Sequence, residues 1–258
     1  MNIKDYKGQV VWIIGASSGI GAALAANLAQ QGARVAVSAR REEALKQVAD
    51  ESKAEWYLAL DINDLSSIES AQNSLINQAG RIDRIIFLSA IYTPMQLDNL
   101  DISEVTKVVQ TNLLGTFNLI KVSYPYLLGN KSGQLALCGS ISGYLGLPFS
   151  QPYAATKAAL INLTESLQAE SIGTGIDIKV INPGFVKTPL TDKNDFAMPF
   201  IMEVDNAAQR VARGLCKKGF EVRFPRRFAM SLKGFARLPY WLKLRLMKST
   251  VIKEKPKL

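Results

Sequence analysis

Short apolar runs rich in Val and Ile alternate along most of the chain with longer segments of helical periodicity. The apolar runs predict strands at residues 9–14, 34–38, 56–60, 84–88, 134–138, 177–181 and 220–224. The segments between them predict helices at residues 19–31, 42–52, 64–79, 102–128, 153–171 and 206–216. Runs that are apolar throughout indicate strands buried on both faces, and a helix between successive strands indicates parallel pairing. The sequence therefore predicts an α/β fold, a doubly wound parallel sheet of about seven strands with helices on both faces.

The composition narrows the chemistry that such a sheet can carry. The 258 residues include no histidine, which excludes a Ser-His-Asp triad, a histidine-ligated zinc site and a histidine acid or base. Two cysteines, Cys138 and Cys216, are too few for a disulfide framework or a four-thiolate zinc site, so no metal is expected. The first residues hold no apolar signal region, and no apolar run reaches the roughly 20 residues that span a bilayer. We therefore expect a cytoplasmic protein with reduced thiols.

A glycine-rich turn joins the first predicted strand to the first predicted helix. It reads Gly15-Ala16-Ser17-Ser18-Gly19-Ile20-Gly21. Glycines let the backbone turn tightly and approach a ligand, and the free N–H groups and dipole at the start of a helix favour a pyrophosphate. A bare structural turn is the alternative, but the strand–turn–helix context is the one that dinucleotide binding requires. The sequence predicts a dinucleotide site formed by Gly15, Ser17, Ser18, Gly19, Ile20 and Gly21.

The end of the second predicted strand indicates which dinucleotide is bound. An acid placed there bonds the ribose 2′-hydroxyl of NAD and repels a 2′-phosphate. This chain has Ser38-Ala39-Arg40-Arg41 instead, a small residue followed by two guanidinium groups that suit a phosphate. The alternative is that Arg40 and Arg41 only solvate the start of a helix. The pattern favours NADP(H) over NAD(H).

Tyr153 and Lys157 lie one helical turn apart at the start of a predicted helix. A phenol has a pKa of about 10, and a nearby ammonium group favours the phenolate, so we expect Lys157 to lower the pKa of Tyr153. Tyr153 is then suited to exchange a proton with a ketone or alcohol oxygen. The fifth predicted strand ends just before Ser140, whose hydroxyl is placed to polarise the same oxygen, with Ser142 as the alternative. The carboxyl edge of a parallel sheet is where ligands bind, and both segments reach that edge.

Taken together, the glycine spacing and the Ser140, Tyr153 and Lys157 set resemble the short-chain dehydrogenase/reductase family, of the single-domain, NADP-dependent type. The resemblance covers roughly residues 8–225 and implies a Rossmann fold and an oxidoreductase. It implies that Asn112 completes a catalytic tetrad by holding a water that links Lys157 to solvent. It also implies that Asp61 contacts the adenine amino group, although an N-cap or turn role is the alternative. The nicotinamide carboxamide is assigned to Thr188 and the Val186 backbone. The other cofactor-binding positions that it implies are Ile62, Ser89, Ala90, Tyr153, Lys157, Pro183 and Gly184.

One motif departs from the family pattern. The family usually carries Asn-Asn-Ala-Gly after the fourth strand, and this chain carries Leu88-Ser89-Ala90-Ile91. It also has Ile14 where a threonine commonly precedes the first glycine. Because both amides and the glycine of the motif are absent, we expect the cofactor affinity or the geometry of this strand end to differ. The tetrad itself is complete.

The resulting prediction is an NADP(H)-dependent enzyme that transfers hydride between nicotinamide and a carbonyl or alcohol carbon. The segment at about 189–205, which is rich in Phe, Met and Ile, predicts a hydrophobic substrate. Two alternatives remain, a catalytically silent NADP-binding regulatory protein and a related epimerase or dehydratase. The resemblance also implies a homodimer or homotetramer that pairs through the long helix and the tyrosine helix.

Charge is concentrated at the end of the chain. The formal net charge is +9, yet residues 217–258 hold 13 basic and two acidic side chains, so the body before them is nearly neutral. We expect residues 1–225 to form the dinucleotide-binding catalytic domain and 226–258 a basic amphipathic tail, part of the same domain or a lid. The tail repeats apolar residues at helical spacing, Tyr240, Leu244, Met247 and Val251. It fits docking on the domain or a partner subunit, or a peripheral membrane contact. Nucleic acid is not expected, because the body is not basic and no recognition motif is present.

Overall fold

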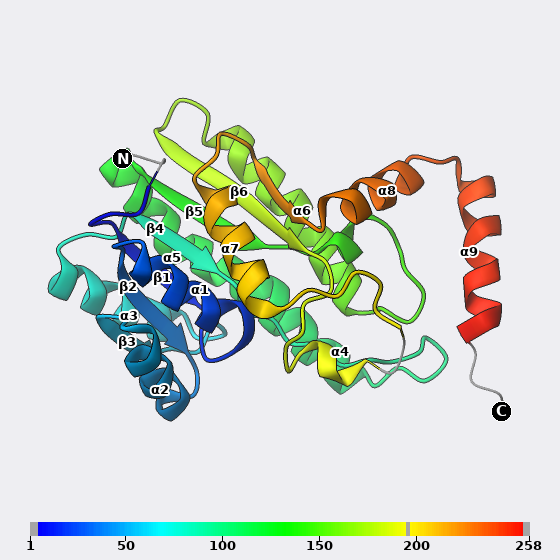
Figure 1. The fold of residues 1–258 in the computed structure, drawn as a ribbon, viewed down its shortest axis with the longest axis horizontal. Helices are drawn as coiled ribbons and strands as arrows, with labels where there is room; N and C mark the ends of the chain where they lie inside the picture. The colour runs from blue at the N-terminus through cyan, green and yellow to red at the C-terminus, as the bar shows by residue number, and fades with distance from the viewer. Residues whose placement is uncertain (1–4, 195–196, 255–258) are drawn as a thin grey trace.

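A single sheet of seven parallel strands runs through the molecule (Figure 1). The computed structural model describes residues 5–194 and 197–254, with side chains described as far as residue 248. The strands lie in the order β3-β2-β1-β4-β5-β6-β7. Their bounds are β1 Val10–Ile14, β2 Arg34–Ala39, β3 Trp56–Ala59, β4 Arg84–Phe87, β5 Gly133–Cys138, β6 Ile176–Pro183 and β7 Glu221–Phe224. The predicted fold class is confirmed.

Helices cover both faces of the sheet (Figure 1). One face is packed by α1 Gly19–Gln30, α2 Glu42–Ser52 and α7 Val204–Leu215. The other is packed by α3 Leu65–Ala79, α5 Gly115–Asn130 and α6 Tyr153–Glu170. Alternate side chains of β1 enter the two cores, with Val11 and Ile13 on the first and Trp12 and Ile14 on the second. This double burial explains why the strands are apolar throughout, since each one contributes to two cores.

The strand order places a crevice at the carboxyl edge of the sheet. The chain builds outward from β1 through β2 to β3, and then returns to add β4 on the other side of β1. The crossovers therefore leave β1 in opposite directions, and such a switch point is where open parallel sheets bind ligands.

The long helix predicted at 102–128 is interrupted in the structure. Helix α4, Ile102–Val109, is followed by a π-helical turn, η1 Gln110–Leu114, which leads without a break into α5. A π turn holds one more residue than an α turn and often lies at a functional site. Here it contains Asn112.

The basic tail forms two helices, α8 Arg226–Ala236 and α9 Tyr240–Glu254. Two short 3₁₀ turns, η2 Ile141–Tyr144 and η3 Thr191–Lys193, lie in the loops beyond β5 and β6. Residues 195 and 196 of the predicted substrate segment, the side chain of Val251 and residues 255–258 of the tail lie outside what is described. Within the described parts of the chain, no helix is both long and apolar enough to cross a membrane.

Candidate active site

A cavity of about 690 Å³ opens at the carboxyl edge of the sheet. This size is in the usual range for small-molecule and cofactor sites. It brings together most of the residues predicted from the sequence. Those lining it are Gly15, Ser17, Ser18, Gly19, Ile20, Gly21, Arg40, Arg41, Ile62, Ser89, Ala90, Ser140, Tyr153, Lys157, Pro183, Gly184, Val186 and Thr188. Two predicted residues, Asp61 and Asn112, do not line it.

Backbone rather than side chains forms one end of the cavity. Gly15 has φ +91°, and a Cβ there would lie 2.4 Å from the backbone N of Ser89 at the end of β4. A Cβ on Gly21 would lie 2.3 Å from the carbonyl O of Gly15. Gly19 has φ +57°, with the Thr188 side chain 3.1 Å from where its Cβ would be. Gly15 therefore lets β1 meet the segment after β4, and Gly21 lets the turn close on itself, at distances that no Cβ permits, while Gly19 leaves close room for Thr188 of the loop after β6.

The start of α1 faces this cradle with its N–H groups uncapped by a side chain. Ser18, in extended conformation, occupies the N-cap without a side-chain hydrogen bond, and the first turn carries no acidic residue. An N-terminus in this state attracts an anionic group. Since the cradle is open, glycine-lined and positive, it fits the pyrophosphate of a dinucleotide.

Ala39, Arg40 and Arg41 line the cavity at the end of β2. Both arginines are exposed, and neither forms an ion pair with any residue that the structure describes. The neighbouring Ser38 is buried, and its Oγ accepts a hydrogen bond of 2.8 Å from Trp12 Nε1. No carboxylate is therefore present in this segment to bond a ribose hydroxyl, while two guanidinium groups are available for a phosphate.

Asp61 serves a local turn. Its Oδ1 accepts a hydrogen bond of 2.9 Å from Asn63 N, and its neighbours Leu60 and Ile62 line the cavity in its place. This is the turn role that the sequence offered as the alternative. The adenine contact implied by the family resemblance stays a prediction.

Asn112 holds the end of β4 in place from the π turn. Its Oδ1 accepts 2.8 Å from Ile91 N, and its Nδ2 donates 2.9 Å to Ile91 O, so one amide satisfies both backbone groups. Nδ2 also lies 3.3 Å from Thr156 Oγ1 on α6. Asn112 is fully buried. In this structure it therefore positions the segment Leu88–Ile91, the one that departs from the family motif, and its water-holding role stays a prediction.

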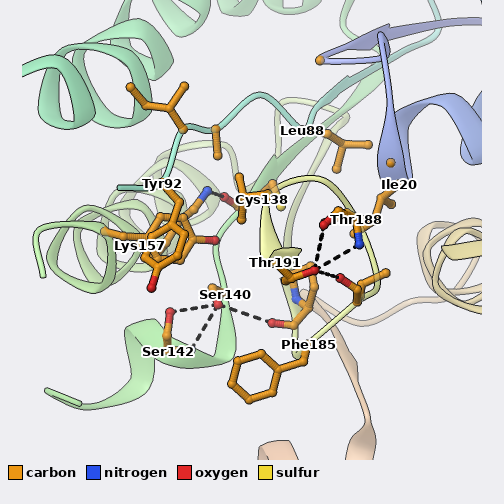
Figure 2. A pocket seen from close by; sticks show the side chains of 18 of the residues that line it. Ile20, Leu88, Tyr92, Cys138, Ser140, Ser142, Lys157, Phe185, Thr188 and Thr191 are labelled. Atoms are coloured by element: carbon orange, nitrogen blue, oxygen red, sulfur yellow. Dashed lines mark hydrogen bonds between the residues drawn. The ribbon is translucent and has the colours of Figure 1, made fainter. Parts of the chain in front are cut away.

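The two serines that follow β5 lie together at the cavity wall (Figure 2). Ser142 Oγ donates to Ser140 Oγ at 2.9 Å, and Ser142 N lies 3.2 Å from the same atom. Ser140 Oγ in turn donates to the carbonyl of Pro183 at 3.4 Å, a long and weak bond. Ser140 Oγ thus accepts a hydrogen bond from Ser142 and donates only a weak one to Pro183. Of the two serines, Ser140 is therefore the one whose hydroxyl proton can turn to a ligand oxygen.

Tyr153 and Lys157 project from the first turns of α6. Lys157 is fully buried, and its Nζ donates 2.7 Å to the carbonyl of Cys138 at the end of β5 (Figure 2). It lies 5.4 Å from the centroid of the Tyr153 ring. Tyr92, which the sequence analysis missed, meets the same ring edge-on at a centroid distance of 5.3 Å. The predicted pair is therefore assembled beside Ser140 at the cavity wall.

The expected lowering of the Tyr153 pKa by Lys157 is wrong for this structure. Burial raises the pKa of Tyr153, and the hydrogen bond with Ser140 only partly opposes it. Burial also lowers the pKa of Lys157. A desolvated phenol resists losing its proton, so Tyr153 is present here as the neutral, proton-carrying form.

The segment after β6 closes into a compact loop. Val186 and Met202 form a parallel bridge at its base, with Lys187 N donating 2.9 Å to Met202 O. Thr191 Oγ1 donates 2.6 Å to the carbonyl of Val186 and accepts 3.0 Å from Thr188 N (Figure 2). These bonds fix Val186 and Thr188 beside the glycine cradle, and their contact with the nicotinamide carboxamide stays a prediction.

Helix α8 completes the cavity with side chains from the basic tail. Phe228 and Leu232, one turn apart, line it, and the Phe228 ring lies 5.4 Å from that of Phe200 in the loop after β6. Neither belongs to a recognisable motif, and only their helical spacing could have suggested a common face. The tail therefore contributes to the cavity wall through α8, and not through the stripe beginning at Tyr240 for which docking was predicted.

An ion cluster ties α8 to the rest of the site. Glu221 on β7 accepts 2.6 Å from Lys233 Nζ of α8 and 2.8 Å from Asn182 Nδ2 of β6. Tyr144 of η2 and Arg223 donate to it as well. Burial alone raises the pKa of Glu221, but these hydrogen bonds outweigh it and lower the pKa to about 2. One carboxylate thus joins the tail helix, the loop after β5 and the end of β6.

Comparison with known proteins agrees with this geometry. Residues 9–197 match the family described as short chain dehydrogenase. An uncharacterized oxidoreductase of Myxococcus xanthus is 32% identical, over 88% of this chain and 91% of its own. A 3-oxoacyl acyl-carrier-protein reductase of Salmonella typhimurium is 32% identical, over 72% of this chain and 77% of its own.

Two solved structures share the fold at 24% identity. Levodione reductase has a TM-score of 0.80, covering 88% of this chain and 99% of its own. An actinorhodin polyketide ketoreductase, determined with NADPH, has a TM-score of 0.75, covering 84% and 95%. The family match extends over most of the sheet and over the serine, tyrosine and lysine at its carboxyl edge. The chain therefore belongs to the short-chain dehydrogenase family of oxidoreductases.

Proposed function

We propose that this protein is an NADP(H)-dependent oxidoreductase that transfers hydride to or from the carbonyl or alcohol carbon of a hydrophobic substrate. One observation carries the proposal. The Ser140, Tyr153 and Lys157 side chains line the same cavity as the glycine cradle and the two arginines. A proton donor, a hydrogen-bond donor and a dinucleotide site in one cavity supply the groups that carbonyl reduction requires.

Support for NADP(H) comes from the cofactor end of the cavity. Ala39 leaves room beside the ribose, and Arg40 and Arg41 present guanidinium groups to a 2′-phosphate. When bound, the cofactor supplies a hydride. Lys157 would then give up its bond to the Cys138 carbonyl, or share it, to reach the nicotinamide ribose.

The chain's own residues complete the reaction. Tyr153 carries the proton that the substrate oxygen receives, and burial, which raises its pKa, holds it as the neutral phenol in the resting site. Ser140 Oγ leaves its weak bond to Pro183 and donates to the substrate oxygen.

The substrate end of the cavity supports a hydrophobic compound. Its wall includes Leu147, Phe149, Pro199, Phe228 and Leu232. Apolar contacts of this kind favour an acyl or other lipid-like carbonyl compound over a small polar one. The similarity to an acyl-carrier-protein reductase and to a polyketide ketoreductase supports the same class.

The test is NADPH oxidation, followed by absorbance, across carbonyl compounds of increasing chain length. We expect turnover with the longer, apolar compounds, and a higher kcat/KM with NADPH than with NADH. NADPH binding without turnover on any member of the panel would favour the silent regulatory protein. Epimerised or dehydrated product, with no net cofactor oxidation, would favour the epimerase or dehydratase.

We also propose a cytoplasmic homodimer or homotetramer that pairs through α5 and α6. Leu114, at the end of the π turn, and Phe117 of α5 are exposed apolar side chains that support such a contact. Light scattering on the purified protein tests it, and a monomer at micromolar concentration would contradict it.

A further inference from the structure

The two tail helices have different relations to the body. Helix α8 is packed, with Ala229 buried, Phe228 in the cavity and Lys233 bound to Glu221. Helix α9 stands apart from the sheet and its covering helices, beyond the edge at which the strands end (Figure 1). Docking on the domain therefore describes α8. It does not describe α9, which carries the predicted apolar stripe and so remains available for a surface contact.

Helix α9 presents large apolar side chains to solvent. Tyr240 is 75% exposed, Trp241 70% and Leu244 59%. Tyr240 and Leu244 lie one turn apart, so they share a stripe, and Trp241 lies beside it. Adjacent aromatic and aliphatic side chains with this exposure are more than scattered surface residues, and such a patch marks an interaction site.

Basic side chains flank the stripe. Lys243 lies along one edge, with its Nζ 4.3 Å from the centroid of the Tyr240 ring. Arg245 lies beyond Trp241 on the other edge, and Lys248 follows Leu244 by one turn on the stripe itself. Lys243 Nζ also lies 3.3 Å from the Ala236 carbonyl at the end of α8. That contact links the start of α9 to the end of the packed helix.

The charge of the tail selects the occupant. Residues 226–248 contain seven basic side chains and no acidic one. A second copy of α9 would bring like charges together, whereas an anionic surface would be attracted. Tyr and Trp are the residues that settle at the boundary between lipid headgroups and acyl chains, and Lys and Arg beside them reach the headgroups.

We propose that α9 docks on an anionic lipid surface, with Tyr240, Trp241 and Leu244 in the headgroup region and Arg245 and Lys248 on the lipid phosphates. The docking does not depend on the proposed reaction.

Vesicle co-sedimentation of the full-length protein tests the proposal. Two vesicle types are compared, phosphatidylcholine alone and phosphatidylcholine mixed with phosphatidylglycerol. We expect binding to the mixed vesicles only, with release as salt is raised because the attraction is screened. A blue shift of the Trp241 fluorescence on binding, absent in Trp241→Phe, would place α9 at the surface.

Two matched double variants distinguish an effect of the α9 charges from an effect of the protein's net charge. Arg245→Gln/Lys248→Gln removes two charges from α9, and Lys7→Gln/Lys46→Gln removes two from exposed positions of the body. We expect the first pair to weaken vesicle binding about 30-fold and the second to leave it nearly unchanged. Leu244→Ser weakens it as well while NADPH oxidation with a soluble substrate is kept.

The proposal is overturned by any of three results. These are equal loss of binding in the two charge variants, equal binding to neutral and anionic vesicles, and no binding to either vesicle. A dimer that Leu244→Ser dissociates would instead assign the stripe to a second copy.

Discussion

The two ends of the cavity are built from different materials. The cofactor end is largely backbone, where Gly15 and Gly21 make approaches that exclude a Cβ and Gly19 packs closely against Thr188. The substrate end is side chains, contributed by the β5 loop, the loop after β6 and α8. A backbone wall has one shape whatever surrounds it, whereas a wall of side chains changes with each residue. The first end is therefore suited to a constant ligand and the second to a variable one.

The catalytic residues lie between the two ends of the cavity. Removing a catalytic group should lower the activity more than any change at either end. Tyr153→Phe deletes the proton but keeps the ring against Tyr92, so the fold and NADPH affinity should be preserved. We expect kcat to fall by about 10²–10⁴-fold, the usual contribution of a general acid. Stopped-flow turnover and NADPH fluorescence titration measure the two quantities, and an unchanged kcat would rule out Tyr153 as the donor.

The backbone end should tolerate no added atom. In Gly15→Ala the methyl group meets the Ser89 backbone, and the residue keeps a φ that favours glycine. We expect a loss of stability of about 1–3 kcal/mol and a weaker affinity for NADPH. Urea unfolding and titration of NADPH check both. Gly146→Ala, where a Cβ has nothing within 4 Å, is the matched control and should change little.

Cofactor choice should depend on the two arginines rather than on the cradle. Replacing both, in Arg40→Ala/Arg41→Ala, removes the groups that face a 2′-phosphate and leaves the glycines intact. We expect kcat/KM for NADPH to fall by about 10–100-fold while that for NADH is nearly unchanged. If both cofactors lose equally, the arginines act on the cradle and the two roles are not separate.

A substitution at the side-chain end should change which substrates bind well without unfolding the protein or weakening NADPH binding. Phe228→Ala opens the wall that α8 contributes and removes its contact with Phe200. We expect KM for a long-chain carbonyl substrate to rise by about tenfold, the effect of one lost apolar anchor, with NADPH affinity unchanged. Met230→Ala, on the exposed face of the same helix, is the control.

The smallest effect should be a pH dependence of how α8 is held. The pKa of Glu221 lies at about 2 in the folded protein, below its ordinary value of 4.5. Its contribution to stability is therefore complete above pH 4.5 and is lost as the pH falls toward 2. Tm measured from pH 6 to pH 3 should fall more for the native chain than for Glu221→Gln. Parallel curves would show that Glu221 does not fasten the helix.

The backbone-built features could be predicted from the sequence, whereas the side-chain wall of the cavity could not. The seven strands and the glycine turn were predicted because buried parallel strands and backbone turns impose residue types locally. Tyr92, Phe228 and Leu232 were missed because a side-chain wall is assembled from distant segments that carry no motif of their own. The pKa of Tyr153 was predicted in the wrong direction, since the sequence places Lys157 nearby but does not reveal how deeply the phenol is buried.

The π turn at Gln110–Leu114 also sets the phase of the helix that contains it. One additional residue turns everything downstream by about 100° relative to a regular α-helix. Asn112 can therefore face Ile91 on one side of the turn while Leu119 and Leu127 still reach the core on the other. If the turn became regular α-helix with the same number of residues, α5 would rotate by that angle and carry Leu119 and Leu127 off the core, so the packing of α5 depends on the π turn.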